Sequence, residues 1–239
     1  LKGNFQFKTK DKIRSTEFSV SSSLRIPKLI GLPNSLFRGT NLPHTDLTLG
    51  FSYQDRPEYK RMMISTSFGY TGNFRRNFTY QFFPFQANIV RLGNISESFA
   101  ERLVADLFLL NAYSDHFDVG MGGMLYYTTD PTPIPKRTYT YGRLSFDLAG
   151  NVLSLFNSAM PTNQVNQHTI WQIPYAQYVR GELQLGQTLR FGDGDTQAVA
   201  LRFLVGAGYG YGNSTTVPFE KQFYAGGANS MRGWQARAL

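Results

Sequence analysis

Hydrophobic and polar side chains alternate with a period of two over long stretches of the chain. The clearest runs lie in the second half of the sequence, where polar or small residues separate the apolar ones. The apolar positions there are Val179, Leu183, Leu185, Leu189 and Phe191 in one run and Val199, Leu201, Phe203, Val205, Tyr209 and Tyr211 in the next. Alternation of this kind predicts β-strands with one apolar face and one polar or small face.

Turn signals separate the alternating runs. Asp55-Arg56-Pro57 and the Gly-Asp-Gly-Asp sequence at 192–195 predict tight connections between strands. The prolines at 131, 133 and 135 exclude a central strand at that point, because each one removes a backbone donor. We therefore predict nine strands, over residues 1–9, 15–27, 45–55, 58–72, 77–92, 116–129, 137–149, 175–191 and 196–212.

The predicted strands are long. A strand in a globular protein averages about 5–6 residues, whereas a tilted strand that crosses a membrane needs about 9–11. Most of the predicted strands have 11 residues or more, and a soluble β-sandwich would have shorter strands and more frequent turns. The predicted fold class is therefore all-β: a transmembrane antiparallel β-barrel whose apolar face is turned toward lipid.

The composition of the chain supports this class and removes others. Aromatic residues make up 15% of the chain and charged residues 17%, against about 25% charged residues in a typical soluble domain, which excludes intrinsic disorder. There is no Cys, and the three His residues are scattered, so we expect no disulfide, metal or cofactor. The net charge is +8, but the densest basic run, from Lys8 to Arg14, lacks interleaved aromatics that stack on bases, so we expect no nucleic-acid partner.

One segment, residues 96–113, follows a helical period instead. Its apolar stripe consists of Phe99, Leu103, Leu107 and Leu110. The spacings of four, four and three predict a short helix within a long loop, with the stripe packed on the barrel rim. Ser98 and Glu101 have the spacing of a capping box, and Ser96 is the alternative N-cap. A second long loop is expected at 150–174.

The sequence contains no catalytic constellation. Asp115-His116 lacks a third group that would orient it, so we expect no enzymatic activity. Gly206, Gly208 and Gly210 recur at every second position with no helix after them, which differs from a phosphate-binding loop. A strand with glycine on its inward face instead leaves room for another segment inside the lumen.

Residues 219–234 are the most informative part of the sequence. They are too aromatic and apolar for a loop that lies free in water, and their glycine pair permits a sharp reversal. Arg232 stands between Met231 on one side and Gly233-Trp234 on the other. On physical grounds two arrangements stay open: the segment folds back into a polar lumen where an interior carboxylate holds Arg232, or it is a surface loop in which Trp234 anchors the rim.

The run from Gly226 to Trp234 resembles the lumen-loop signature of the BamA/TamA family of outer-membrane assembly barrels, in which a glycine pair precedes an Arg-Gly-aromatic tip. The form Phe-Tyr-Ala-Gly-Gly-Ala-Asn-Ser-Met-Arg-Gly-Trp, at 223–234, is most similar to the TamA-like lipoprotein (TamL) branch of Bacteroidetes. Further stretches that resemble this branch are Arg-Ile-Pro at 25–27, Pro-His-Thr at 43–45, Tyr-Gln-Asp-Arg-Pro-Glu-Tyr at 53–59 and Ser-Phe-Gly-Tyr at 67–70. The similarity therefore covers most of the chain.

The resemblance implies a position within a larger barrel. The family's barrel has sixteen strands and carries the signature in the loop after the eleventh, so the nine predicted strands are the third to the eleventh. Residues 1–239 are then a partial barrel domain that ends in the lumen-loop motif, with POTRA domains and closing strands absent. The same strand count implies that residues 93–115 lie outside the cell and that residues 28–44 and 130–136 lie in the periplasm.

The resemblance also implies a function. It is that of a non-enzymatic factor in the outer membrane of a Gram-negative bacterium, which inserts or translocates proteins through a weak lateral seam. The implied partners are outer-membrane lipids, nascent outer-membrane proteins as substrates and a periplasmic TamB-like protein. The alternatives are a porin-like channel, a dedicated secretion pore and a soluble β-rich binding protein.

The resemblance and the glycine pattern together assign two groups of site residues. The lumen-loop motif comprises Gly226, Gly227, Arg232, Gly233 and Trp234. The lumen-facing support comprises Gly206, Gly208, Gly210, Arg180, Glu182 and Arg202. We expect the motif to form the turn and the brace of the lumen loop, and the support to give it space and polar partners.

Overall fold

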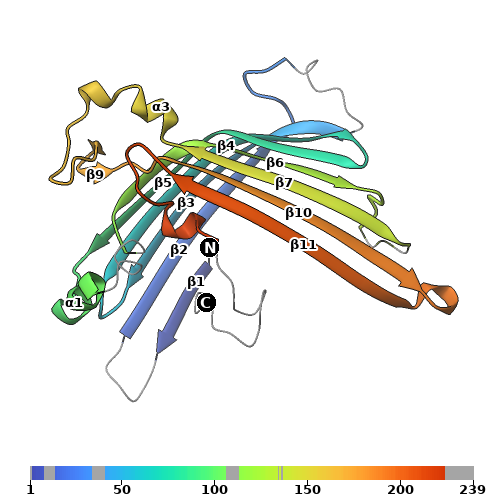
Figure 1. Cartoon of the computed structure of the whole chain (residues 1–239), viewed down its shortest axis with the longest axis horizontal. Coiled ribbons are helices and arrows are strands. Elements are labelled where there is room, and N and C mark those ends of the chain that lie inside the picture. Colours follow the sequence, from blue (N-terminus) through green and yellow to red (C-terminus); the bar gives the residue numbers. More distant parts are fainter. Residues whose placement is uncertain are drawn as a thin grey trace.

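The computed structural model describes residues 2–7, 14–33, 41–105, 113–133, 135 and 137–223. Within these residues, nine strands form one antiparallel sheet in the order β1-β2-β3-β4-β5-β6-β7-β10-β11 (Figure 1). Their bounds are β1 (Lys2–Phe7), β2 (Arg14–Ile26), β3 (Asn41–Asp55), β4 (Lys60–Arg75), β5 (Phe78–Gly93), β6 (His116–Thr128), β7 (Tyr139–Ala149), β10 (Tyr178–Phe191) and β11 (Gln197–Gly210). The nine strands predicted from the alternation are confirmed, with their ends shifted by a few residues.

The strand order follows the chain, with one excursion. Between β7 and β10 the chain leaves the sheet and forms α3 (Asn151–Ser154) and a small hairpin of β8 (Thr169–Ile170) and β9 (Ile173–Pro174). It then returns, so that Tyr178 of β10 pairs with Ala149 of β7. The alternation did not reveal the hairpin, because each of its strands has only two residues.

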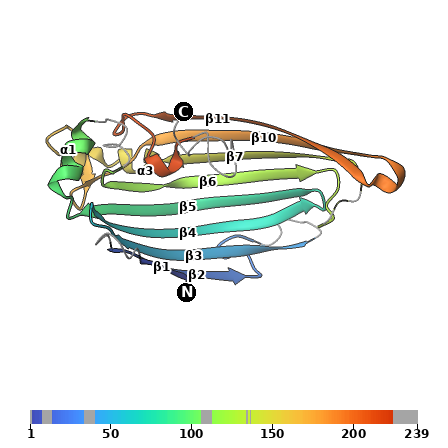
Figure 2. The same cartoon turned by 90° about the horizontal axis from the view of Figure 1, so that it is seen from below.

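The sheet is curved but not closed. Figures 1 and 2 show its strands side by side as the wall of a trough. In the part of the chain that the structure describes, β1 and β11 are the two edges and each pairs with a single neighbour. The protein is therefore a portion of a transmembrane antiparallel β-barrel wall, as the sequence predicted.

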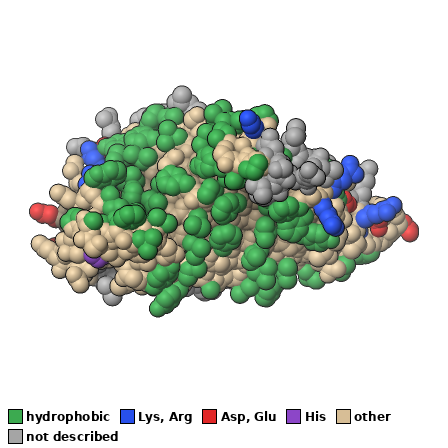
Figure 3. Space-filling model, turned by 90° about the horizontal axis from the view of Figure 1, so that it is seen from above, with side chains coloured by type: hydrophobic (Ala, Val, Ile, Leu, Met, Phe, Trp, Pro, Cys, Tyr) green, Lys and Arg blue, Asp and Glu red, His purple; other side chains and the backbone are tan. Residues whose placement is uncertain are grey.

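The two faces of the wall differ in the way that the alternation predicts. On the convex face, Leu183 pairs with Val205 and Leu185 pairs with Phe203, and all four side chains are exposed. Leu201 and Phe203 have exposed fractions as high as 58% and 60%, and Figure 3 shows hydrophobic side chains over much of this face. A water-soluble protein would bury rows of large apolar side chains like these. The convex face is therefore the lipid-facing side.

The two ends of the wall also differ. One end, named here the helical end, carries α1 (Glu97–Ala105), α3 and the β8–β9 hairpin (Figures 1 and 2). The opposite end, named the hairpin end, has tight connections at 76–77 and 192–196, the second of which contains the 3-10 turn η3 (Asp193–Asp195).

Helix α1 packs against the turn between β3 and β4. Phe99 and Leu103 are buried with Tyr59, and the ring centroids of Tyr59 and Phe99 lie 5.6 Å apart. The first half of the predicted stripe therefore packs on the rim as expected. The second half, Leu107 and Leu110, lies outside the described residues.

The N-cap of α1 is Ser96, and the capping box predicted from Ser98 and Glu101 is wrong. The carbonyl of Ser96 accepts the backbone N–H of Ala100 at 2.8 Å, which makes Ser96 the residue before the first turn. Ser98 lies within the helix, because the helix begins at Glu97. Among the described residues, no helix is long and apolar enough to cross a membrane.

Candidate functional site

After β11 the chain turns back beneath the concave face of the sheet. Residues 211–223, named here the return segment, include the 3-10 turn η4 (Phe219–Lys221), and Figures 1 and 2 show η4 within the trough. Side chains of the return segment contact β4, β6, β7, β10 and β11. The segment therefore connects strands from both sides of the hollow.

Asn213 fixes the start of the return segment to the loop that precedes β10. Its buried side-chain amide donates to the carbonyls of His168 and Tyr175, both at 2.9 Å. Its side-chain oxygen accepts the N–H of His168 at 2.6 Å, and its own backbone N–H donates to Oε1 of Gln177 at 3.0 Å. If Asn213 were displaced, these buried groups would lose their hydrogen-bond partners. The hydrogen bonds therefore fix the position of the start of the return segment.

The return segment packs into the row formed by Gly206, Gly208 and Gly210 on the concave face of β11. A Cβ at Gly206 would overlap the ring of Phe223, and a Cβ at Gly210 would lie 2.7 Å from the backbone of Thr216. Side chains in this row would therefore displace the segment. Glycine in a strand often marks such a close approach of a second piece of chain.

Arg180 of β10 holds the far end of the return segment. Its Nε donates to the carbonyl of Lys221 at 2.8 Å, and its guanidinium carbon lies 4.1 Å from the ring centroid of Phe223. Its terminal nitrogens pair with Glu182 at 3.0 Å and with Asp147 at 3.4 Å, and Nζ of Lys221 pairs with Asp147 at 3.4 Å. Two cations and two carboxylates thus neutralise one another in the hollow, which offsets the loss of their hydration.

Glu220 binds two further strands of the wall, β4 and β6. One of its carboxylate oxygens pairs with Arg61 of β4, and the other lies 3.3 Å from Nε2 of His116 at the start of β6. The next residue, Lys221, pairs with β7. Consecutive side chains of η4 therefore attach the return segment to β4, β6 and β7 in the middle of the wall.

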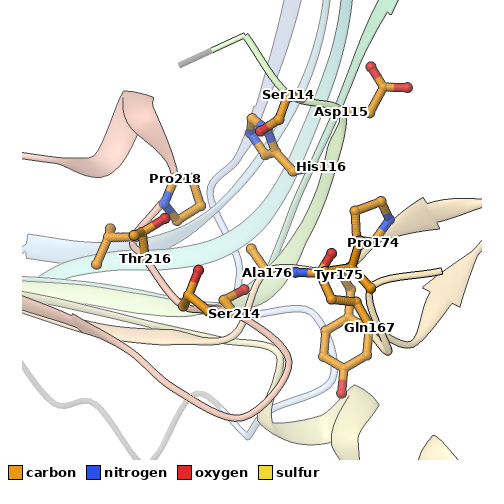
Figure 4. A pocket seen from close by; sticks show the side chains of 13 residues that line it. Ser114, Asp115, His116, Gln167, Pro174, Tyr175, Ala176, Ser214, Thr216 and Pro218 are labelled. Carbon is orange, nitrogen blue, oxygen red and sulfur yellow. The ribbon is translucent and has the colours of Figure 1, made fainter. Parts of the chain in front are cut away.

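A pocket of about 420 Å³ lies at the helical end. It is bounded by the residues that lead into β6, by the end of the loop before β10 and by the return segment. Figure 4 shows Ser214, Thr216 and Pro218 on one side of this pocket, with Ser114 and His116 on the other. The pocket marks where the return segment enters the hollow.

Asp115 and His116 do not form a catalytic dyad. Asp115 accepts the backbone N–H of Leu92 at 2.6 Å, and Figure 4 shows its carboxylate directed away from the pocket. Nδ1 of His116 lies 3.1 Å from the carbonyl of Ser114, while Nε2 faces Glu220. The two side chains instead connect β6 to β5 and to the return segment.

The structure places most of the predicted support residues together. Arg180 and Glu182 lie beside the glycine row, opposite Gly208 and Gly206 in the register of β10 and β11. Arg202 lies opposite Gly186, nearer the hairpin end. The predicted motif residues Gly226, Gly227, Arg232, Gly233 and Trp234 lie outside the described residues.

The charged partners that fix the return segment were not predicted from the sequence. These are Arg61, His116, Asp147, Glu220 and Lys221. Arg61 and Asp147 occupy inward positions of alternating runs, and that signal marks them as lumen-facing. Which of them pair with the return segment depends on the width and curvature of the trough, which local sequence patterns do not contain.

A curved antiparallel wall with an apolar convex face, and a charged hollow that holds a returning piece of chain, defines an outer-membrane β-barrel with an internal loop. The sequence model of the Omp85 superfamily domain matches residues 6–239, and the chain belongs to this superfamily. A search of curated proteins returned no match. The expected BamA/TamA-type barrel is thus confirmed at the level of the superfamily.

Omp85 proteins are β-barrel proteins of the outer membrane of Gram-negative bacteria. They are non-enzymatic factors that insert or translocate proteins, and their substrates are outer-membrane proteins. At this level the superfamily accounts for the location and for the general role that the sequence predicted.

Proposed function

We propose that this chain belongs to an outer-membrane assembly factor of the TamL branch, and that it carries the lumen loop of that factor. The observation that supports the proposal is the path of the return segment. Glu220, Lys221 and Phe223 bind the concave wall directly before the motif at 226–234. The assignment to the branch rests on the sequence of the motif.

In this proposal the return segment sets where the motif lies. Three peptide steps separate Phe223 from Gly226, so the two Cα atoms are at most about 11 Å apart. Because Phe223 is anchored, we expect a glycine turn at Gly226-Gly227 to lie close to the hollow. Arg232 is then held by an interior carboxylate from a later strand, and Gly233 and Trp234 brace the loop against the wall.

The proposed substrates are nascent outer-membrane proteins. The helical end faces the outside of the cell and the hairpin end faces the periplasm, where a TamB-like partner would deliver substrate. Unpaired backbone groups are costly in lipid, so a weak seam between the first and last strands of the complete barrel accepts a substrate strand by β-augmentation. The outer-membrane lipids that surround the barrel are the remaining proposed partner.

The contents of the hollow disfavour the porin-like alternative. A porin keeps a water-filled channel, whereas here the return segment lies in the trough and is fixed by ion pairs to β4, β6 and β7. We expect the full-length protein to show low single-channel conductance in a planar bilayer. A large and stable conductance would favour a channel, and a single co-purified exported protein would favour a dedicated secretion pore.

The test of the proposal is Arg232→Ala in the full-length protein, with Arg232→Lys as the charge-retaining control. We expect Arg232→Ala to lower the amount of folded outer-membrane proteins in cells that depend on the variant, and to lower the unfolding temperature of the barrel. Arg232→Lys should retain part of both. Unchanged values of both quantities in Arg232→Ala would contradict the bracing role.

A further inference from the structure

The loop between β7 and β10, residues 150–177, has no acidic side chain and no lysine or arginine. No Asp, Glu, Lys or Arg occurs between Asp147 and Arg180, although such residues make up 17% of the chain. Loops that lie in water usually carry many of these residues, because charged side chains are rarely buried. The composition of this loop therefore indicates surroundings other than bulk water.

Polar groups of the loop bond to one another. The side-chain oxygen of Asn163 accepts the backbone N–H groups of Val165 at 3.0 Å and of Gln167 at 2.8 Å. The hydroxyl of Tyr175 donates to Oδ1 of Asn157 at 2.6 Å. The loop is thus held by internal hydrogen bonds, and the exposed polar side chains on its outer surface, such as Gln164 and Asn166, are uncharged.

Large apolar side chains occupy that outer surface. Val152 of α3 is 58% exposed, and Leu155 and Phe156, which follow α3, are 78% and 58% exposed. Trp171, at the tip of the β8–β9 hairpin, is 72% exposed. A cluster of this kind on a structured loop marks a contact surface rather than a random exposure.

The backbone at the hairpin tip adds a second observation. Trp171 and Gln172 have φ values of 51° and 66°, the conformation of a two-residue turn that usually contains Asn and Gly. A tryptophan in this left-handed region is strained. A contact made by the exposed ring would compensate for that strain.

Trp171 continues the lipid-facing surface of the barrel. Its ring lies edge-on to the ring of Phe117 of β6, with centroids 6.1 Å apart. Phe117 pairs with Ile89, Ile89 with Ile64, and Ile64 with the exposed Phe51. Directly paired residues project from the same face of a sheet, so this cross-strand row belongs to the convex face.

Figures 1 and 2 place α3 on the side of the sheet opposite to η4. The return segment thus fills the concave side, and α3 lies at the rim of the convex side. Through the contact of Trp171 with Phe117, the loop adjoins the surface that faces lipid at the helical end.

We infer that Val152, Leu155, Phe156 and Trp171 form a membrane anchor, which enters the lipid layer beside the barrel at its helical end. Tryptophan is enriched at the boundary between headgroups and acyl chains, and a short apolar face inserts about 5–10 Å into that boundary. Because the loop has no Lys, Arg, Asp or Glu, its insertion does not carry the free-energy cost of placing a charged side chain in lipid. The anchor fixes the depth of the helical end in the membrane.

The inference depends on the barrel fold and not on the proposed assembly activity. The experiment uses single cysteines in the full-length protein, with any cysteine outside this chain replaced by serine, because the chain itself has none. Leu155→Cys is the test position, Leu201→Cys is the lipid-facing reference, and Thr215→Cys is the exposed control in the return segment. Each variant is labelled with an environment-sensitive NBD dye in phosphatidylcholine–phosphatidylglycerol vesicles.

The expected result is a blue-shifted emission at position 155. Its quenching by doxyl-labelled lipids should approach that at 201 and exceed that at 215 severalfold, while iodide in the buffer should quench 215 most strongly. A label at 155 that iodide quenches as strongly as at 215 would overturn the anchor. A label shielded from both quenchers would indicate a protein contact and also overturn it, and an unquenched label at 201 would overturn the membrane position of the whole wall.

Discussion

The guanidinium carbon of Arg180 lies 4.1 Å from the ring centroid of Phe223, so an aromatic side chain of the return segment covers a cation of the barrel wall. The same guanidinium pairs with Asp147 and Glu182. A desolvated cation–π contact contributes about 2 kcal/mol, more than an exposed one. Arg180 therefore connects the charges of the wall with the residue that leads into the motif.

Arg180→Ala should loosen the return segment. The variant removes the guanidinium that pairs with the carboxylates of Asp147 and Glu182, so less positive charge balances these two carboxylates. We therefore expect the free energy of unfolding to fall by about 1–3 kcal/mol. Urea unfolding of the barrel in lipid vesicles measures this. Arg143→Ala is the control, because Arg143 is exposed and lies on the same face of β7 as Asp147. It should change the free energy of unfolding by about 0.5 kcal/mol or less. Equal losses in the two variants would contradict the anchoring role of Arg180.

Gly206→Ala should displace Phe223, because the new Cβ overlaps the phenylalanine ring. Overpacking of this kind costs about 1–3 kcal/mol, and proteinase K should cleave the return segment faster. Gly181→Ala is the matched control, since a Cβ at Gly181 meets nothing within 4 Å. The double variant with Phe223→Ala removes the obstacle and should recover part of the stability. A double variant no more stable than Gly206→Ala would show that the ring is not the cause.

The orientation of the wall was predictable because it depends only on local geometry. Side chains project alternately from a strand, so the sequence around Leu183 and Leu185 is sufficient to assign their faces. The pairing of Glu220 with Arg61 was not predictable in this way. It requires the chain to reverse after β11 and to cross the trough, and both depend on the curvature of the whole sheet.

Pro84 shows the same limit within a single strand. A proline in the middle of the predicted strand 77–92 argues against a central position, because it removes a ladder donor. The structure accommodates it at a β-bulge, where the pairing of β5 with β6 shifts between Phe83 and Gln86. The sequence marks the irregular residue, whereas the shift of register follows from the neighbouring strands.

Tyr59 should make the helical end sensitive to high pH. Burial, together with the neighbouring Tyr113, raises the pKa of Tyr59 to about 12 from its ordinary value of 10.0. As the pH rises, the Tyr59 proton dissociates from the unfolded chain first. The free energy of unfolding therefore keeps its full value below about pH 10 and falls by about 2–3 kcal/mol as the pH rises toward 12. Unfolding midpoints at pH 9 and pH 11.5 measure the loss. Tyr59→Phe should lose less stability over that interval, and a loss equal to that of the wild type would contradict the assignment.

A charge exchange tests whether Glu220 anchors the return segment through Arg61. Glu220→Lys places two cations together, and Arg61→Glu in the same protein restores an opposite pair. The double-mutant cycle should give a coupling free energy of about 1–3 kcal/mol, because the side chains are mostly shielded from water. The equivalent exchange of Asp55 and Lys60, a pair with about two-fifths of each side chain exposed, is the control and should give less than about 1 kcal/mol. Urea unfolding supplies the energies, and the rate of proteinase K cleavage within 211–223 reports the segment itself. A coupling no larger than that of the control pair, with unchanged cleavage, would mean that Glu220 does not anchor the segment through Arg61.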